Sequence, residues 1–316
     1  MCMEDEIRRG TLLNGAWIKK VPSYYSPAQA VQFLECMNLD LGLGEEEIAK
    51  GTAPTSQEAL TRIVERFLIT FPWENTQMHY SAEHLMDVSP EGLFNRMVVE
   101  KKGGSYCIGL NGLLLGMLRA LGYRAYCSIA KANYGPIGGP LDYVPPTHRI
   151  IFVQPQAHSN QTYLVDTGHG FGLSTPILLS NEEDNTVQSL NSFEKLRLTR
   201  TPHPSSSLES SPGSEASTEI KWNLEAYQKK KDSLGSDWRV LYSFSEEEFH
   251  EEDFEAASFL ISKRPVLRGL FWHHVVCTKN FVVPEEERTL HSRASANGTV
   301  MHAAKRCIDS SWLVGK

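Results

Sequence analysis

The feature that most constrains the fold is one change in the period of the apolar residues, close to Tyr123. Before it, apolar side chains recur at the spacing of amphipathic helices; after it, short segments alternate or are rich in β-branched and aromatic residues. This order predicts an α+β protein in which helices come first and a sheet follows. With 316 residues, 41% of them hydrophobic, the chain can build two or three subdomains.

Four segments before that change are predicted to be helical. Two begin with a Ser-Pro pair, at Ser26 and Ser89, which places a capping residue before a proline in the first helical position. Residues 56–68 carry apolar side chains at helical spacing, and residues 108–121 form a long apolar run. We therefore expect a helical bundle in this part of the chain.

Beyond the change, residues 123–200 are predicted to be rich in strands. Residues 201–219 are dominated by Ser and Pro, and such a segment buries too little apolar surface to offset its ordering entropy. We therefore expect a disordered insertion there. Residues 222–242 and the acidic run at 246–255 are predicted to be at least partly helical.

The charge balance argues against several classes of partner. Lys and Arg number 31 and Asp and Glu 38, so the formal net charge is −7. This gives no general electrostatic reason to bind nucleic acid or an anionic membrane. No stretch approaches the roughly 18 apolar residues of a membrane span, and the N-terminus lacks the apolar core of a secretory signal. A cytoplasmic location is expected.

The six cysteines are scattered without a CxxC pair, so we expect free thiols in a reducing compartment. His273, His274 and Cys277 could suggest metal ligands, but no second cluster accompanies them. The sequence therefore predicts no metal site.

Cys107 is the first residue that points to chemistry. It follows a Gly-Gly-Ser-Tyr run and precedes the apolar helix predicted at residues 108–121. The first turn of a helix stabilises an anion through its free N–H groups and its dipole, and the thiolate is the nucleophilic form of cysteine. The alternative is an inert buried thiol, which is common.

His148 and Asp166 lie at matching positions of two strand-like segments joined by a polar turn centred on Ala157. In a symmetric hairpin they would be direct cross-strand partners, with Cβ atoms roughly 5 Å apart. The carboxylate could then hold one imidazole nitrogen and leave the other for a thiol. A surface ion pair is the alternative, and a register shift of one residue would separate the two side chains.

Taken together, these motifs resemble the arylamine N-acetyltransferases, particularly the fungal branch of that family. The resemblance runs from about residue 24 to residue 281. The family's motifs match, in order, a glutamate and asparagine at Glu74 and Asn75, a glycine-rich run ending in cysteine and followed by asparagine at 102–111, a histidine heading a strand at His148, a Val-Asp-x-Gly-x-Gly at 165–170, and downstream segments at 238–244 and 253–255.

The resemblance implies a papain-like Cys-His-Asp core in three parts. These are an N-terminal helical bundle over residues 1–122, a central β-barrel over 123–200, and a C-terminal α/β lid over 220–316 with an atypical end. The Ser/Pro-rich insertion at 201–219 separates the last two parts.

The resemblance also implies a ping-pong acyl transfer with Cys107, His148 and Asp166 as a catalytic triad. Cys107 attacks the thioester of acetyl-CoA, His148 moves protons, and Asp166 orients the imidazole. The acceptor is an arylamine, hydrazine or arylhydroxylamine, as in xenobiotic metabolism. Malonyl-CoA is an alternative donor.

Trp73, Tyr106 and His169 occupy positions at which the family places acceptor-pocket side chains. His169 stands where phenylalanine is usual, and the Gly- and Pro-rich loop at 133–146 is expected to shape the entrance. The alternative for Trp73 and Tyr106 is that they are core aromatics.

Three departures from the family pattern bear on activity. Lys102 replaces an arginine that we expect to pair with Glu74, and lysine lacks the fork geometry of that side chain. Gly109 replaces a glutamate. After Phe281 the family's strand and terminal helix are not recognisable, which bears on the CoA cleft.

Two other functions remain open at this point. One is a papain-like hydrolase or transglutaminase, since those enzymes share the order of the three residues. The other is a catalytically silent relative that binds aromatic amines or a partner protein. Acylation of Cys107 by an acyl-CoA separates them from the transferase.

Overall fold

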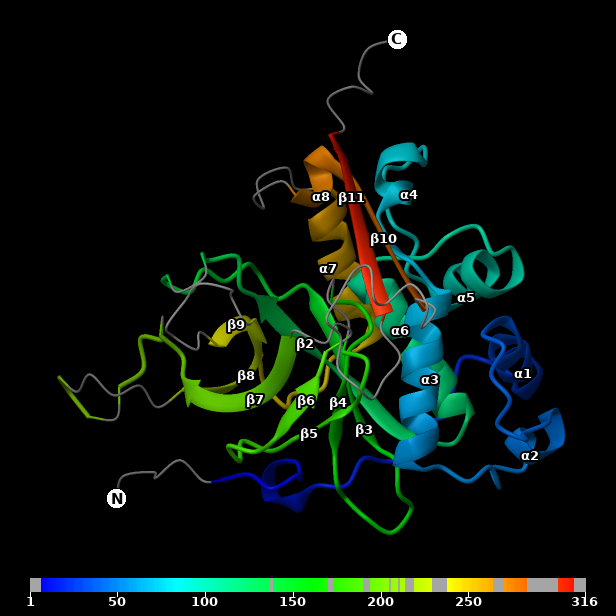
Figure 1. The fold of residues 1–316 in the computed structure, drawn as a ribbon, viewed down its shortest axis with the longest axis horizontal. Coiled ribbons are helices and arrows are strands. Elements are labelled where there is room, and N and C mark those ends of the chain that lie inside the picture. The colour runs from blue at the N-terminus through cyan, green and yellow to red at the C-terminus, as the bar shows by residue number, and fades with distance from the viewer. Residues whose placement is uncertain are drawn as a thin grey trace, which may run out of the picture.

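The computed structural model describes residues 7–136, 139–169, 173–189, 194–204, 206–209, 211–213, 219–228, 238–263, 270–282 and 301–309. The N-terminal helices lie on one side of the molecule and most strands on the other, with the C-terminal helices and strands above and between them (Figure 1). None of the helices in these ranges is both long enough and apolar enough to traverse a bilayer.

The helices of the first part have these bounds: η1 Leu13–Gly15, α1 Pro27–Cys36, α2 Glu45–Ala49, α3 Gln57–Thr70, α4 Thr76–Tyr80, α5 Pro90–Phe94, η2 Asn95–Val99 and α6 Cys107–Ala120. The four predicted helices are confirmed, and their starts follow the expected chemistry. The side chains of Ser26, Ser56 and Ser89 accept hydrogen bonds from backbone N–H groups three residues ahead. The last predicted helix begins one residue earlier than expected, at Cys107.

Helix α6 is buried along most of its length because it packs between the other helices and the sheet. It contacts α1 and α5 on one side and strands β2 and β3 on the other. Leu113, Leu114 and Leu118 are fully buried, and each such side chain contributes about 2 kcal/mol through burial. The nucleophile candidate thus sits at the start of a helix that is buried along most of its length.

An eight-stranded antiparallel sheet follows, in the order β5-β4-β3-β2-β9-β8-β7-β6. Its strands are β2 Arg124–Ala132, β3 His148–Gln154, β4 Tyr163–Val165, β5 Ile177–Leu178, β6 Thr186–Gln188, β7 Glu194–Pro202, β8 Ile220–Gln228 and β9 Trp238–Phe244. Figure 1 shows the sheet strongly curled. It encloses a second apolar core that includes Phe152, Leu198 and Phe244.

The helix predicted over residues 222–242 is wrong, because the described residues of this segment belong to strands β8 and β9. Trp222, Leu224 and Ala226 alternate along β8, and all three are buried in the core of the curled sheet. This period of two is typical of a strand. Since the sheet takes strands from both sides of the Ser/Pro-rich segment, we propose that the β domain continues to Phe244.

The predicted disordered insertion over residues 201–219 lies partly outside the described residues. Positions 205, 210 and 214–218 lie outside the described residues, whereas Thr201 and Pro202 complete strand β7. His203 N–H donates to the carbonyl of Glu219, so the two ends of the segment lie close together.

The C-terminal part contains α7 Glu251–Lys263 and α8 Leu270–His273. A three-stranded sheet combines β1 Trp73–Glu74 with β10 His274–Val282 and β11 Met301–Asp309. The strand that could not be recognised in the sequence after Phe281 is present as β11, which pairs antiparallel with β10 along its whole length. Its apolar signal is weak, so only the pairing reveals it.

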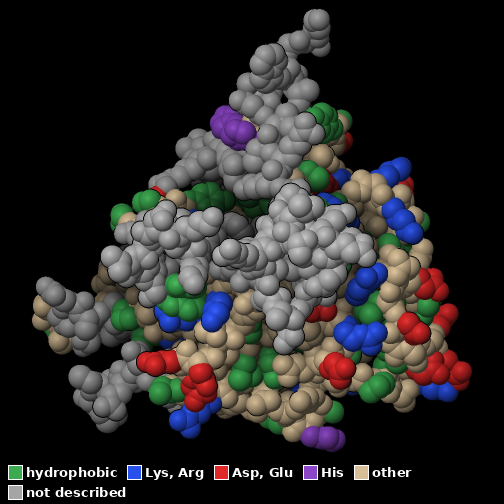
Figure 2. All heavy atoms as spheres, in the orientation of Figure 1, with side chains coloured by type: hydrophobic (Ala, Val, Ile, Leu, Met, Phe, Trp, Pro, Cys, Tyr) green, Lys and Arg blue, Asp and Glu red, His purple; other side chains and the backbone are tan. Residues whose placement is uncertain are grey.

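The surface carries both signs of charge. On the face drawn in Figure 2 acidic and basic side chains are interspersed, and acidic ones gather over α2, where Glu45, Glu46 and Glu47 are exposed. Acidic side chains in the first turn also suit the dipole of this short helix.

Candidate active site

Cys107 is the first residue of α6 and is 7% exposed. The residue before it, Tyr106, does not cap the helix with its side chain. The first-turn N–H groups of α6 are therefore not occupied by a hydrogen bond from that side chain. The sulfur lies 3.8 Å from the carbonyl oxygen of Thr147, at the start of strand β3. The bundle and the sheet therefore meet at this thiol.

His148 follows Thr147 directly and begins β3, which brings its ring beside Cys107. Its Nε2 donates to Oδ2 of Asp166 over 2.7 Å, and its side chain is also hydrogen-bonded to that of Cys107. Since Nε2 is taken by the carboxylate, Nδ1 is left for the sulfur. The structure thus brings the three predicted residues together in a continuous chain.

The hairpin reaches this arrangement by a register different from the predicted one. Strands β3 and β4 pair Ile151 with Val165, which is a shift of two residues. His148 and Asp166 are therefore not direct partners, and that prediction is wrong. A shift of two preserves the face on which each side chain lies, so the residues still meet diagonally.

Asp166 is fully buried and accepts four hydrogen bonds. Its Oδ2 faces His148, and its Oδ1 accepts from Asn111 Nδ2 at 2.9 Å and from the N–H groups of Gly168 at 2.9 Å and His169 at 3.1 Å. Burial alone would raise the pKa of this carboxyl group. The positive charge of His148 and the hydrogen bonds outweigh it and hold the pKa well below its usual range.

The same pair controls the charge of the imidazole. Burial lowers the pKa of His148, but the charge and hydrogen bond of Asp166, together with Cys107, outweigh that effect and raise the pKa to about 10. The ring is therefore cationic at neutral pH. The ring thus places a positive charge beside the sulfur of Cys107.

Asn111 completes the site, and the sequence reasoning did not single it out as a functional residue. It lies one turn after Cys107 on α6, is fully buried, and also donates to the carbonyl of Arg149 at 2.5 Å. Its Oδ1 accepts from the N–H and the hydroxyl of Thr167, both at 2.9 Å. The spacing of four residues from Cys107 was the available signal, since such residues share a helix face.

Gly168 explains part of the Val-Asp-x-Gly motif. A Cβ at this position would lie 2.5 Å from the Cα of Cys107 and 3.0 Å from Nδ2 of Asn111. Only glycine allows the turn after β4 to approach the start of α6 this closely.

A cavity of about 430 Å³ opens beside Cys107. The described residues that line it are Trp73, Cys107, Ala132, Asn133, Tyr134, Val144, Thr147, His148, Gly168, His169, Arg239, Leu241, Ile261, Phe271, Val276 and Thr278. The predicted entrance loop contributes through Asn133, Tyr134 and Val144, whereas residues 137 and 138 lie outside the described residues.

Of the three predicted pocket side chains, Trp73 and His169 line this cavity. Trp73 packs against Phe271 with ring centroids 5.2 Å apart, and His169 meets His148 edge to face at 5.6 Å. Tyr106 does not reach the cavity. It is fully buried and its hydroxyl is hydrogen-bonded to Ser258 of α7, so the core alternative describes it better.

Gly109 is accommodated by its neighbours. A Cβ here would lie 2.1 Å from Oγ of Ser105 and 2.8 Å from Cδ2 of Leu93. The space that a side chain needs is therefore filled, and the family's glutamate could not stand here without rearrangement.

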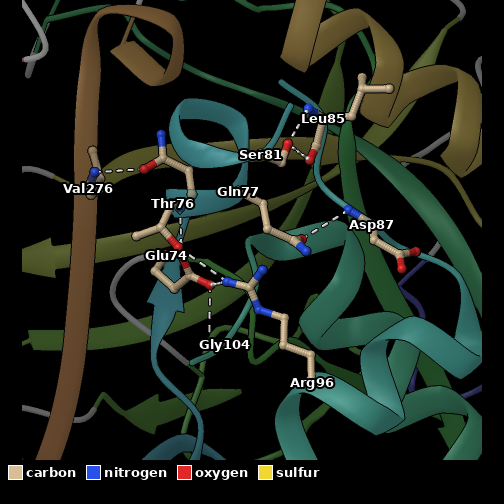
Figure 3. Close-up of polar contacts among 10 residues, drawn as sticks. Glu74, Thr76, Gln77, Ser81, Leu85, Asp87, Arg96, Gly104 and Val276 are labelled. Atoms are coloured by element: carbon tan, nitrogen blue, oxygen red, sulfur yellow. Dashed lines mark hydrogen bonds and ion pairs between the residues drawn. The ribbon is translucent and has the colours of Figure 1, made fainter. Parts of the chain in front are cut away.

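Glu74 pairs with Arg96 and not with Lys102, so that expectation is wrong (Figure 3). Lys102 is 71% exposed and lies 3.3 Å from Glu100 instead. Arg96 comes from η2 and reaches the buried carboxylate from the side. Glu74 also accepts from the N–H of Gly104 at 3.3 Å, which fastens the glycine-rich run ahead of Cys107.

Asn75 connects this run to the C-terminal part. Its Oδ1 accepts from the N–H of Val276 at 2.7 Å, and its Nδ2 donates to the carbonyls of His274 at 2.9 Å and Phe271 at 3.0 Å. The Glu-Asn pair thus links the cysteine loop to the strand and helix that form one wall of the cavity.

Within the described ranges, no cluster of three or more His, Cys, Asp or Glu side chains is arranged to hold a metal ion.

Comparison with known proteins gives consistent results. A family profile described as N-acetyltransferase matches residues 56–303. The chain is 27% identical to "N-malonyltransferase FDB2" of Fusarium pseudograminearum, over 88% of this chain and 80% of that protein. It is 30% identical to "Arylamine N-acetyltransferase" of Mycobacterium tuberculosis over 44% of this chain and 47% of that protein.

Solved structures share the fold. The arylamine N-acetyltransferase of Mycobacterium marinum, solved in complex with CoA, aligns with a TM-score of 0.58 at 20% identity, covering 79% of this chain and 76% of that one. The α+β fold that the resemblance implied is therefore confirmed.

The first prediction concerns the support of the cysteine loop. Arg96→Met leaves the buried carboxylate of Glu74 without its cation, and we expect the free energy of unfolding to fall by about 3 kcal/mol. The matched variant Lys102→Met removes an exposed lysine and should change that free energy by less than about 0.5 kcal/mol. Urea denaturation measures both. Equal effects of the two variants would contradict the assigned pairing.

The second prediction concerns pH. The folded-state pKa of His148, about 10, lies above the ordinary value of 6.5. The stability contributed by its charge is therefore fully present below about pH 6.5 and lost as the pH rises through about 10. The loss of unfolding free energy in His148→Gln should thus be largest near pH 6 and shrink toward pH 10.

Unfolding measured across this range, with the exposed His158→Gln as control, checks the prediction. The control removes a histidine on the surface, so the comparison isolates the buried position of His148. A difference for His148→Gln that is flat or grows with pH would mean that His148 is not a buried cation.

Proposed function

Because this chain belongs to the N-acetyltransferase family and is therefore an acyl-CoA-dependent acyltransferase, we propose that it acylates aromatic amines through an acyl-Cys107 intermediate. Hydrazines and arylhydroxylamines belong to the same acceptor class. The observation that carries the proposal is the buried chain of contacts from Asp166 through His148 to Cys107, on the wall of a cavity large enough for an acyl group and a ring.

The first half of the reaction is acylation of the cysteine. The Cys107 thiolate attacks the thioester carbonyl carbon of acyl-CoA, and the negative charge moves to the carbonyl oxygen. The first-turn N–H groups of α6 are available donors for that oxygen. As the bond to the CoA sulfur breaks, the leaving thiolate takes the Nδ1 proton of His148 and departs as CoA.

The second half returns the enzyme to its starting state. The acceptor nitrogen attacks the acyl-cysteine carbonyl while neutral His148 takes its proton. The Cys107–acyl bond breaks, and the thiolate forms again beside the imidazolium. Asp166 holds Nε2 throughout, so that Nδ1 stays directed at the reacting atoms.

The cavity walls suit an aromatic acceptor. Trp73, Phe271 and His169 present ring faces or edges near Cys107, and such surfaces bind flat apolar groups well. The relative named "Arylamine N-acetyltransferase" supports this acceptor class. The structure solved with CoA supports CoA as the carrier of the acyl group. A cytoplasmic location stays a prediction.

The third prediction tests the intermediate. Brief incubation with acetyl-CoA or malonyl-CoA should add one acyl group to the intact protein, as measured by mass spectrometry, and an added arylamine should remove it. Cys107→Ala should abolish the adduct because the nucleophile is gone, whereas variants of another thiol should keep it.

The control is Cys277→Ser, which alters an exposed cysteine that is not among the described residues lining the cavity. An adduct that persists in Cys107→Ala, or one that water discharges as fast as the amine does, would contradict the proposed transferase. The second outcome would indicate a hydrolase. Folded protein that neither thioester acylates would indicate a silent binding relative.

A further inference from the structure

The cavity beside Cys107 contains a cation that the transfer of an uncharged acetyl group does not require. Arg239 lies on strand β9, and its side chain lines the same cavity as Cys107 and His148. Among the described residues that line the cavity, it is the one lysine or arginine, and no aspartate or glutamate is present.

The guanidinium of Arg239, unlike that of Arg197, has no acidic partner among the described residues. Its Nε is buried and has no hydrogen-bond partner among the described residues. Within those residues no carboxylate lies within 4.0 Å of it, whereas Arg197 pairs with Glu225 at 2.8 Å and stacks over Trp238. A buried donor without an acceptor is costly. Its place in the cavity wall directs it toward a ligand.

Building on the proposed function, we propose that Arg239 binds the free carboxylate of a dicarboxylic acyl group, such as malonyl, carried by CoA and then by Cys107. A guanidinium offers a planar pair of N–H donors that matches a carboxylate. The same cavity is also lined by the His148 imidazolium and, among the described residues, by no acidic side chain. The cavity therefore attracts the negative charge of a carboxylate on the acyl group.

The position along the strand fits this role. Leu241, two residues after Arg239 on β9, lines the same cavity, and Tyr242, the next residue, packs against His148 with ring centroids 5.0 Å apart. Three strand residues span about 10 Å, a distance that an extended arginine side chain and a malonyl group bridge together. The relative named "N-malonyltransferase FDB2" agrees with this acyl group.

The test distinguishes the carboxylate of the acyl group from two other anions that could bind Arg239, the CoA phosphates and a carboxylated acceptor. Acylation of Cys107 is timed by mass spectrometry, without acceptor, using malonyl-CoA and acetyl-CoA. Arg239→Gln should slow malonylation roughly 10- to 100-fold, as expected for a lost charged hydrogen bond, and change acetylation less than about 3-fold. Arg239→Lys, which keeps the charge, should recover part of the malonylation rate.

The control variant is Lys131→Gln, which neutralises an exposed lysine of β2 next to the cavity-lining Ala132. It should leave both rates unchanged. Unaltered acetylation in Arg239→Gln also demonstrates that the variant is folded.

Three results would overturn the inference. Equal slowing with both donors would assign Arg239 to the CoA phosphates or to general positioning. Unchanged malonylation, with slower discharge only to a carboxylated amine such as 4-aminobenzoate, would assign it to the acceptor. Wild-type protein acylated by acetyl-CoA but not by malonyl-CoA would remove the inference and leave the proposed function standing. Acylation by neither donor would remove the proposed function itself.

Discussion

The buried carboxylate of Asp166 is the constraint on which the rest of the site depends. An unpaired charge at this depth is costly, so the fold must supply donors to it. The donors come from α6 through Asn111, from β3 through His148, and from the turn after β4. Solvating this one charge therefore requires that the helical part and the sheet dock in a single way, and that docking brings His148 to Cys107.

A second buried carboxylate organises the other side of the nucleophile. Glu74 accepts a hydrogen bond from Gly104 in the glycine-rich run, and Asn75 accepts one from Val276 in the C-terminal strand β10. The wall of the cavity and the loop before Cys107 are thus positioned by the same two residues. This explains why Lys102 is tolerated in place of an arginine, since Arg96 provides the cation for Glu74.

The electrostatics of the cavity suit a two-step transfer. Under the proposed mechanism both half-reactions use one pocket, in which an imidazolium faces the sulfur and the described lining contains no acidic side chain. Such a pocket would stabilise negative charge on the departing CoA sulfur and on the acyl group. Gly109 does not disturb this arrangement, because Ser105 and Leu93 fill the space where a side chain would stand.

Features that follow from local rules could be predicted from the amino-acid sequence alone. Serine caps marked the helix starts, and the spacing of apolar residues distinguished the helices from most of the strands. The motif order identified the residues that the structure brings together at Cys107. The hairpin argument survived an error in register because a shift of two leaves each side chain on its face.

Which distant segments meet depends on how the whole molecule packs. The partner of Glu74, the burial of Tyr106 against α7, the bridging role of Asn111 and the place of Arg239 all depend on contacts between residues far apart in the chain. Local period and capping carry no information about such pairs. These contacts depend on which buried polar groups find hydrogen-bond partners when the helices, the curled sheet and the C-terminal strands pack together.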